Sequence, residues 1–330
     1  MAIEFFINIS LLSLLLATAL GIVLSRDLLA VIMLSGIYGF LSASFFVLMD
    51  AVDVAFTEAA VGSGISPLLM LLTVALVGRR EKHSPSRNIP ALILVTITGA
   101  LLVIGTLSMP EFGSANAPAN THVSPRYIGQ SADEIGIPNI VTSVLASYRG
   151  FDTFGEVAVV FTAGIGVLTL LMLKPSGSQT PVISGAHKHK ILRIVSKILI
   201  PPILLFALYV QFHGEYGPGG GFQAGVIFAA AIILYTMFFG VDLAQQVVSS
   251  ALLRILAAFG VLLYGSVGLV SMLNGGDFLD YSVLAENPVT GQHIGIIIIE
   301  LGVGITVAAV MVMIFYCFAS QVNNSAETDE

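Results

Sequence analysis

The chain has 330 residues, of which 56% are hydrophobic and only 10% are charged, and its formal net charge is −7. Because soluble domains carry about 25% charged residues, this composition excludes an ordinary soluble domain and indicates a protein of the lipid bilayer. The single cysteine, Cys317, excludes an internal disulfide and a cysteine-based metal cluster.

Nine apolar segments are each long enough to cross a bilayer, which takes about 20 residues. They cover residues 5–24, 28–48, 54–77, 89–108, 154–173, 191–210, 221–240, 251–273 and 294–318. The sequence therefore predicts an all-α, polytopic membrane protein with nine spans. The third segment contains Glu58, Gly62, Gly64 and Pro67, which predicts a break at membrane depth that protein or a water-filled cavity must cover.

Basic residues lie almost entirely in one of the two alternating sets of loops that nine spans create. That set holds 11 of the 13 basic residues, namely Arg26, Arg79, Arg80, Lys82, Arg87, Lys174, Lys188, Lys190, Arg193, Lys197 and Arg254. The other set holds Arg126 and Arg149. Since cytoplasmic loops carry an excess of Lys and Arg, we expect the N-terminus outside and the C-terminus in the cytoplasm.

The longer connections follow from this orientation. Residues 78–90 and 174–190 become cytoplasmic linkers, and 109–152 becomes an outside segment with a short apolar helix over 140–148. His187 and His189 alternate with lysines in the second linker, which indicates a solvated basic loop, with a metal site as the alternative. The polar, acidic tail 323–330 is predicted to be disordered.

Acidic side chains in or beside the spans are the first candidates for function, because a charge at the bilayer centre costs roughly 2.5–3.5 kcal/mol on insertion scales. Glu58 lies in the third span near Asp50 and Asp53. It is either a relay carboxylate for an ion or proton, or an interfacial acid at a helix start. Glu300 lies deep in the ninth span. It is either a relay group or a neutral acid hydrogen-bonded to a neighbouring helix.

The motif Tyr-Arg-Gly-Phe-Asp-Thr-Phe-Gly-Glu, at 148–156, leads into the fifth span. Asp152 or Thr153 is a candidate helix cap. Glu156 would then lie in the first turn, where a negative charge suits the helix dipole. The functional alternative makes Glu156 the outer end of a cation path, with Arg149 balancing the charge of Asp152.

A glycine-rich segment, 213–225, joins the sixth and seventh spans. It follows no strand and lacks the Lys-Ser/Thr pair of a phosphate-binding loop, so we reject nucleotide binding. His213 and Glu215 are either a local hydrogen-bonded pair or part of an outer vestibule, and His293, just before the ninth span, is either interfacial or titrating. Four glycines predict a tight re-entry and a close helix contact: Gly219, Gly220, Gly221 and Gly225.

The spans contain acids but no Lys or Arg at their centres, since Lys197 and Arg254 lie near the ends that we assign to the cytoplasm. We find no site for a redox centre and expect no resident cofactor. The sequence therefore predicts a carboxylate-lined route for Na⁺ or H⁺ that needs partner chains to do work. The predicted ion-path residues are Asp50, Asp53, Glu58, Asp152, Glu156, His213, Glu215 and Glu300.

At these motifs the chain resembles the multisubunit Mrp-type Na⁺/H⁺ antiporters and the related membrane arms of energy-converting hydrogenases. Residues 1–85, with three spans, resemble an MbhD-like (DUF4040) module through Asp-Val-Ala-Phe-Thr-Glu-Ala-Ala-Val-Gly at 53–62. Residues 86–180, with two spans, resemble an MbhE-like module through Asn-Ile-Val-Thr at 139–142 and the 148–156 motif. Residues 181–322, with four spans, resemble the MnhB-like module of these antiporters through 213–225 and Glu-Leu-Gly-Val-Gly at 300–304.

The resemblance implies an accessory, ion-path-forming subunit of a Na⁺:proton antiporter in the bacterial plasma membrane, and a transporter subunit rather than an enzyme. It implies that acids matching Glu58 and Glu156 take part in cation transport, with Glu300 in a second relay or a polar contact between subunits. Implied partners are complex-I-like proton-channel subunits, which would supply the buried lysines that this chain lacks, small membrane subunits and lipids, with no nucleic acid.

Three alternatives stay open. The first is a membrane-arm subunit of an energy-converting hydrogenase or related redox-driven pump. The second is a structural scaffold that only holds partner subunits together, and the third is a stand-alone channel. Glu58→Gln and Glu156→Gln variants test the scaffold, because a scaffold needs neither carboxylate.

Overall fold

The structure is a computed structural model that describes residues 2–81, 88–111, 113–172 and 190–327. Regular structure within these residues is helical, apart from an isolated bridge between Asp27 and Arg80. The described residues contain nine stretches long and apolar enough to cross a membrane, which confirms the predicted fold class. The predicted linker histidines, His187 and His189, lie outside the described residues.

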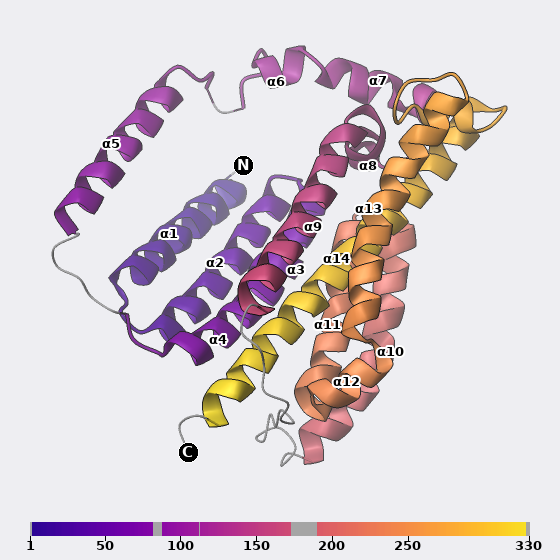
Figure 1. Ribbon diagram of the computed structural model, residues 1–330. Helices are drawn as coiled ribbons and strands as arrows, with labels where there is room; N and C mark the ends of the chain where they lie inside the picture. Colours follow the sequence, from indigo (N-terminus) through magenta and orange to yellow (C-terminus); the bar gives the residue numbers. More distant parts are fainter. Residues whose placement is uncertain (1, 82–87, 112, 173–189, 328–330) are drawn as a thin grey trace.

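The elements follow one another as shown in Figure 1. The order is α1 (Ala2–Leu24), α2 (Leu28–Leu48), α3 (Val52–Ala60), π-helix η1 (Val61–Ile65), α4 (Ser66–Val77), α5 (Asn88–Leu107), α6 (Pro118–Thr121), α7 (Ser124–Glu134), α8 (Ile140–Thr142), π-helix η3 (Ser143–Tyr148), α9 (Gly150–Met172), α10 (Lys190–His213), α11 (Gly221–Phe239), α12 (Val241–Val247), α13 (Ser250–Leu273), 3₁₀-helix η5 (Tyr281–Leu284) and α14 (Pro288–Glu327).

The third span is one continuous helix with a π-helical turn, η1, between α3 and α4. The predicted break is therefore a change of helix type, a form that recurs at functional sites. Helix α2 covers it closely, since a Cβ atom on Gly39 would lie 2.7 Å from the carbonyl carbon of Gly62. Helix α2 therefore covers one side of the irregular backbone, at Gly62 and Ser63, while Gly64 is exposed.

Helix α14 forms the centre of the best-packed part of the molecule, with α9, α11 and α13 along it. Small residues bring these helices together: a Cβ on Gly302 of α14 would lie 2.7 Å from the Gly260 carbonyl oxygen of α13. Helix α14 continues to Glu327. Residues 323–327 are therefore helical where the sequence predicts a disordered tail, because neither glycine nor proline interrupts 321–327.

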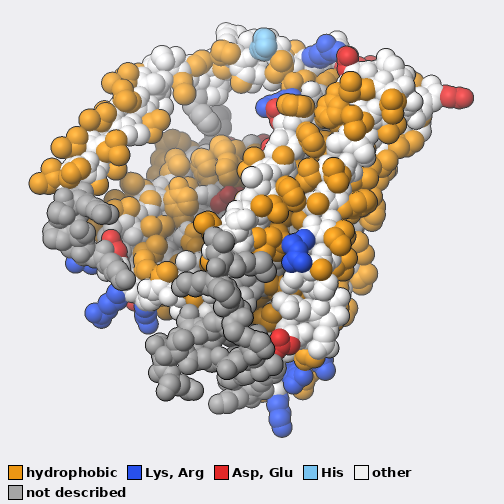
Figure 2. Space-filling view, viewed as in Figure 1, with side chains coloured by type: hydrophobic (Ala, Val, Ile, Leu, Met, Phe, Trp, Pro, Cys, Tyr) orange, Lys and Arg blue, Asp and Glu red, His pale blue; other side chains and the backbone are white. Residues whose placement is uncertain are grey.

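Helices α1 and α5 lie at the periphery. Helix α1 packs on α2, whereas α5 stands apart from the other spanning helices and is joined to them through α6 and α7 (Figure 1). Side chains of α5 are exposed along its described length. Figure 2 shows apolar side chains over most of the visible surface, as expected for helices that face lipid.

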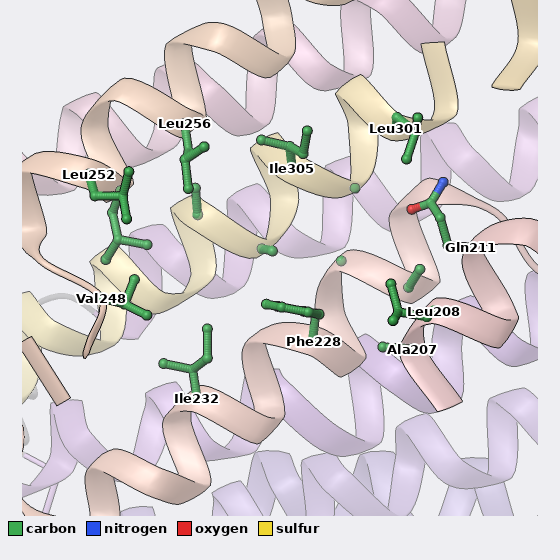
Figure 3. Close-up of a pocket in the computed structure, with 16 residues that line it drawn as sticks. Ala207, Leu208, Gln211, Phe228, Ile232, Val248, Leu252, Leu256, Leu301 and Ile305 are labelled. Carbon is green, nitrogen blue, oxygen red and sulfur yellow. The ribbon is translucent and has the colours of Figure 1, made fainter. Parts of the chain in front are cut away.

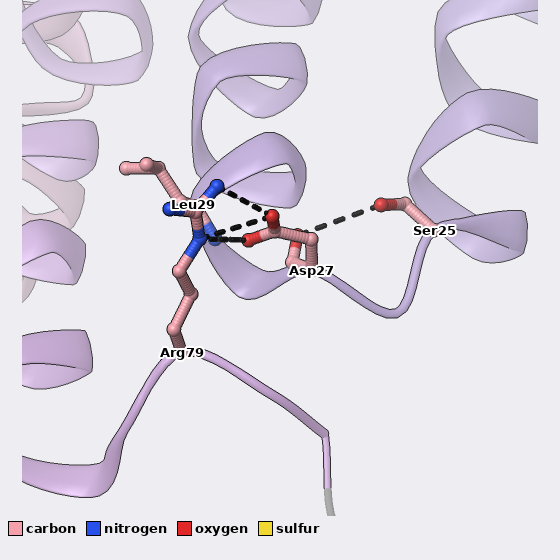
Figure 4. Close-up of polar contacts among 4 residues, drawn as sticks. All are labelled: Ser25, Asp27, Leu29 and Arg79. Atoms are coloured by element: carbon pink, nitrogen blue, oxygen red, sulfur yellow. Dashed lines mark hydrogen bonds and ion pairs between the residues drawn. The ribbon is translucent and has the colours of Figure 1, made fainter.

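Basic residues gather at the end of the molecule where the C-terminus lies (Figures 1 and 2). There Arg79 holds Asp27 in a forked ion pair, with Nε 3.0 Å from both carboxylate oxygens and Nη2 2.7 Å from Oδ2 (Figure 4). Asp27 also caps α2 by accepting from the Leu29 amide. The hydrogen bond from Arg79 lowers the pKa of Asp27. The assignment of this end to the cytoplasm stays a prediction.

Candidate functional site

The glycine-rich loop between α10 and α11 folds back onto α10. The Gly220 amide donates to the Val210 carbonyl oxygen at 3.0 Å, and Gly220 has a φ of +125°, which favours glycine. A Cβ on Gly219 would lie 2.7 Å from that same oxygen. These glycines therefore make the tight re-entry that the sequence predicts.

Two further glycines of α11 let this helix touch α14. A Cβ on Gly225 would lie 2.7 Å from the Gly304 carbonyl oxygen, and one on Gly221 would lie 2.9 Å from the Gly304 amide. The predicted close helix contact is thus confirmed. As a consequence the Glu300 carboxylate of α14 lies directly against the loop, near the α-carbons of Gly214 and Gly220.

Asn139 joins three parts of the chain at this loop. Its Nδ2 donates to the carbonyl oxygens of Gly214 at 3.1 Å and Gly217 at 3.0 Å, and to Asp53 Oδ2 at 3.4 Å. Its Oδ1 caps α8 by accepting from the Val141 amide at 3.0 Å. Asp53 of α3 accepts in turn from the Gly219 amide at 3.1 Å. The first, second and third predicted modules therefore meet at one polar junction.

A cavity of about 620 Å³ opens beside this junction. Asp53, Glu156 and Glu300 line it from α3, α9 and α14, and the loop glycines line it from α11. Gln223 also lines it and donates to the Thr57 hydroxyl at 2.9 Å, which fixes α11 against α3. Three carboxylates from separate helices thus face one cavity, an arrangement that can hold a cation or pass a proton.

Several predicted ion-path residues lie elsewhere. The Glu58 carboxylate turns back against Gly62 on its own helix and is not among the described residues that line the cavity. Asp50 is exposed in the turn between α2 and α3, where its φ is +58°. Asp152 is half exposed and paired with Arg149. Whether these three carboxylates carry ions stays a prediction.

His213 and Glu215 do not form the local hydrogen-bonded pair that is one of the two alternatives drawn from the sequence. The His213 ring stacks on Tyr209 with 4.9 Å between centroids, whereas Glu215 Oε2 lies 3.1 Å from His293 Nδ1 of α14. The cause is the turn of the loop after His213, which directs the two side chains to different helices. Glu215 therefore belongs to the α14 side of the loop.

The start of α9 also differs from the sequence-based expectation. The helix begins at Gly150, so Asp152 and Thr153 lie inside its first turns rather than at a cap. Thr153 donates to the Leu145 carbonyl oxygen at 2.8 Å, which ties α9 to η3. The predicted pairing of Arg149 with Asp152 is confirmed, with Nη2 2.6 Å from Oδ2. Glu156 keeps its place near the helix start and lines the cavity from an exposed position.

A tyrosine anchors the segment 109–152, which the sequence predicts to lie outside and which we call the outer segment, beside this helix start. The Tyr148 hydroxyl donates to Glu134 Oε2 at 2.5 Å, and Arg126 pairs with Glu134 Oε1 at 3.0 Å. The hydrogen bond from Tyr148 lowers the pKa of Glu134. Burial, followed by Glu134, raises the pKa of Tyr148 to about 12. This cluster is therefore ionised at Glu134 and neutral at Tyr148 near pH 7.

Residues missed as site residues are neutral amides and hydroxyls. Asn139, Thr57 and Gln223 fix the junction, yet the sequence-based set of ion-path residues holds no neutral side chain in these roles. Asn139 stands directly before a short apolar helix, which is a capping signal. Gln223 is a polar residue at the start of an apolar span. Both signals are present in the sequence, but neither specifies the partner across the fold.

A second cavity, of about 320 Å³, lies between α10, α11, α13 and α14 (Figure 3). Figure 3 shows leucine, isoleucine, valine and phenylalanine side chains pointing into it, with Gln211 as the polar exception among the labelled residues. Such a lining suits apolar atoms rather than ions. We therefore place the candidate ion site at the carboxylate-lined cavity.

The nine apolar helical stretches among the described residues define a multi-pass integral membrane protein, in which carboxylates of α3, α9 and α14 line one cavity. Family models match three consecutive regions: MbhD, the D subunit of MBH, over residues 13–79; MbhE, the E subunit of MBH, over 87–181; and "Domain related to MnhB subunit of Na+/H+ antiporter" over 191–313. The putative antiporter subunit mnhB2 of Staphylococcus aureus is 36% identical over 129 residues, which cover 89% of that protein and 38% of this chain. The chain belongs to the family of the MnhB subunit of the Na⁺/H⁺ antiporter.

Longer relatives match more of the chain. The A/B subunit of a probable K⁺/H⁺ antiporter of Rhizobium meliloti is 25% identical over 324 residues, or 89% of this chain. The A subunit of the Na⁺/H⁺ antiporter of Alkalihalophilus pseudofirmus is 31% identical over 145 residues, or 44% of this chain. This chain spans only 32% and 18% of their respective lengths.

Two solved structures share the fold. A chain of the Mrp complex from Dietzia sp. DQ12-45-1b aligns with 94% of this chain and 34% of its own length, at a TM-score of 0.77 and 25% identity. A chain of an archaeal membrane-bound sulfane sulfur reductase aligns with 72% of this chain and 97% of its own length, at a TM-score of 0.54 and 29% identity. The predicted resemblance to Mrp-type antiporters is therefore confirmed.

Proposed function

We propose that this chain is an ion-path subunit of a multisubunit antiporter that exchanges a monovalent cation for protons across the bacterial plasma membrane. Its relatives are named as subunits of Na⁺/H⁺ and K⁺/H⁺ antiporters. The transported ions are Na⁺ or K⁺ and H⁺, no resident cofactor takes part, and the chain is not itself an enzyme. Its partners are other antiporter subunits, including complex-I-like proton-channel subunits that supply buried basic residues.

One observation carries this proposal: Glu300 lies at membrane depth on a cavity that also holds Asp53 and Glu156. Among the described residues that line this cavity, Asp53, Glu156 and Glu300 carry acidic groups and no Lys or Arg is present. Negative charges that lack basic partners favour a proton or a metal cation between them. A carboxylate in such a setting can hold a proton or a cation and pass it on.

The proposal is tested with Glu300→Gln in the assembled complex. Everted vesicles from a strain without other antiporters are energised, and Na⁺ or K⁺ is added while the pH gradient is followed. We expect at least about a tenfold loss of exchange, a modest demand on a positioned proton-transfer group. Glu286→Gln is the matched control, because Glu286 is exposed. A normal rate in Glu300→Gln vesicles with normal complex content contradicts the role.

A redox-driven complex is the second candidate, and the similarity to a chain of the sulfane sulfur reductase supports it. Purification of the native complex distinguishes the two. Iron–sulfur subunits that co-purify in fixed ratio favour the redox-driven complex, whereas proton-channel subunits alone favour the antiporter. The scaffold alternative fails if Glu300→Gln assembles normally and loses exchange.

A further inference from the structure

A third and smaller cavity also borders Glu300. It measures about 40 Å³ and is lined by Gln211, Phe212, Glu215, Ile297 and Glu300. Glu300 thus borders both this cavity and the cavity of about 620 Å³. The smaller one reaches toward the end of the molecule where α14 begins, because Glu215 contacts His293 in the second turn of that helix.

Glu215 is buried, with one carboxylate oxygen in contact with His293 and the other without a hydrogen-bond partner among the described residues. Its side chain is only 10% exposed, and its Oε2 lies 3.1 Å from His293 Nδ1. Its Oε1 is buried and has no hydrogen-bond partner among the described residues. A buried carboxylate oxygen without a partner is costly, so a purely structural Glu215–His293 pair does not explain this placement. The adjoining cavity offers this oxygen space for a water partner.

The cavity has the size and polarity that water needs. One water occupies about 10–15 Å³ of this kind of volume and needs two to four polar partners, so about 40 Å³ accommodates roughly two or three molecules. Glu215, Glu300 and Gln211 supply polar groups. Water placed there would give Glu215 Oε1 its missing partner and would link it to Glu300.

The register of α14 places the residues of this route along one face of the helix. His293, Ile297 and Glu300 are separated by four and three residues, so they share one helix face. At about 1.5 Å per residue, His293 and Glu300 are about 10 Å apart along the helix axis. His293 is 32% exposed, whereas Glu300 lies further along α14 inside the span.

We propose that His293 and Glu215 form a proton inlet that connects solvent at the start of α14 with Glu300 through water in the small cavity. The inference rests on the proposed antiporter function. It assigns the start of α14 to the path of the proton rather than to the path of the metal cation. It adds His293 as a residue that positions and transfers the proton.

The transfer balances at each step. His293 takes a proton from solvent on Nε2 and releases the one on Nδ1 to Glu215 Oε2, so one N–H bond forms as another breaks. The neutral Glu215 carboxyl turns, and its O–H donates to cavity water, which passes a proton to the Glu300 carboxylate. Glu215 is again ionised, and His293 regains its first tautomer by exchange with water.

Other titratable groups from the packed elements lie around this route. Asp53 of α3 lines the larger cavity together with Glu300, and the His213 ring of α10 stacks on Tyr209. The residues that line the two cavities include no Lys or Arg. A proton that enters at His293 therefore meets carboxylates in sequence, with no fixed positive charge to block it.

His293→Ala in the assembled complex tests the inlet in everted vesicles. We expect at least about a tenfold loss of cation-driven proton exchange, with recovery when imidazole is added to the buffer, because the partly exposed site admits it. Recovery by imidazole distinguishes proton transfer from a structural role. His122→Ala is the control, since His122 is exposed on the outer segment. A normal rate in His293→Ala, or a loss that imidazole does not restore, contradicts the inlet.

A second variant decides the matter if His293→Ala does not assemble. Glu215→Gln keeps the size of the side chain and removes its proton-accepting charge, and we expect it to assemble and lose exchange. A normal exchange rate in that variant also contradicts the inlet. Wild-type vesicles that exchange no cation for protons overturn the proposed function and the inlet with it, whereas normal wild-type exchange beside unaffected variants overturns the inlet alone.

Discussion

Helices α14 and α5 are both apolar enough to span a membrane, yet they differ in how they pack. In the most apolar stretch of α14, 61% of residues are buried, whereas none is buried in the corresponding stretch of α5 or of α1. Both α14 and α5 contain glycines. Gly302 and Gly304 of α14 touch neighbouring helices, while Gly99 and Gly105 of α5 have no atom within 4 Å of an added Cβ.

The difference shows that apolarity determines insertion but not packing. Lipid tails are as apolar as leucine, so helices associate in a membrane through close packing of small residues and through hydrogen bonds. Helix α14 has both, and it also carries Glu300 and His293. The polar route is therefore held in the part of the molecule with the closest backbone contacts.

The largest expected effect comes from adding one methyl group at the α11–α14 contact. Gly225→Ala places a Cβ about 2.7 Å from the Gly304 carbonyl oxygen, and overpacking of this kind costs about 1–3 kcal/mol. The gain in helix propensity, up to about 1 kcal/mol, offsets only part of this cost. We expect a lower unfolding temperature of the purified complex in detergent.

Gly99→Ala is the matched control in α5. Nothing lies within 4 Å of its added Cβ in this chain, so the same change is expected to be neutral or slightly stabilising. Equal destabilisation by both substitutions would contradict the contrast between the two helices, and would show that a partner chain packs on α5 as tightly as α11 packs on α14.

The next largest effect is expected at the polar junction of the three modules, where Asn139 contacts the glycine-rich loop. Asn139→Ala removes the donor to the Gly217 carbonyl oxygen and the cap of α8. Loss of a partner for a buried acceptor costs about 1–3 kcal/mol. We expect a lower unfolding temperature together with reduced exchange. Asn120→Ala is the control, because Asn120 donates to the Ser114 carbonyl oxygen on the exposed outer segment. An equal loss of unfolding temperature and of exchange in both variants would contradict a special role of the junction.

Much of the fold could be predicted from the sequence, and much less of the site. Nine spans follow from apolar runs, since only helices satisfy the backbone in lipid at these lengths. The tight loop and the α11 contact follow from its glycines. The depth of Glu58 in its span predicts a place in the relay, yet its carboxylate turns toward Gly62. Depth is a property of the sequence, whereas the direction of a side chain depends on which helices pack together.

The pairing of His293 with Glu215 shows the same limit. The two residues are 78 positions apart, and only the fold of the loop onto α14 brings them together. By contrast, the pairing of Arg149 with Asp152 is predictable, because the two residues are only three positions apart in the sequence and need no contact with another helix.

A smaller effect is expected at the outer segment, which joins α5 to the packed helices. The hydrogen bond from Tyr148 lowers the pKa of Glu134, so its contribution to stability is present above the ordinary value of 4.5 and is lost as the pH falls through the lowered pKa. The pKa of Tyr148 rises from 10.0 to about 12, so that contribution is complete below pH 10 and is lost as the pH approaches 12.

Tyr148→Phe removes both contributions. We expect a slightly lower unfolding temperature near pH 7 and a weaker dependence of that temperature on pH at both extremes. Tyr216→Phe is the control, since Tyr216 is exposed on the α10–α11 loop. An unchanged pH profile in Tyr148→Phe would show that the Tyr148–Glu134 contact does not contribute to stability.

The smallest effect is expected in the loosely packed region, at the ion pair between Asp27 and Arg79. Both side chains are exposed, by 39% and 65%, and exposed pairs contribute little because water and salt screen them. Asp27→Asn isolates the charge, since asparagine still caps α2. Asp27→Asn and Arg79→Gln should lower the unfolding temperature slightly, to the same extent, and the decrease should vanish at high salt. A large decrease that persists in salt would mean that this ion pair, and not the contact of α1 with α2, holds the N-terminal helices together. The tightly and loosely packed regions would then differ in the kind of interaction that stabilises them rather than in its strength.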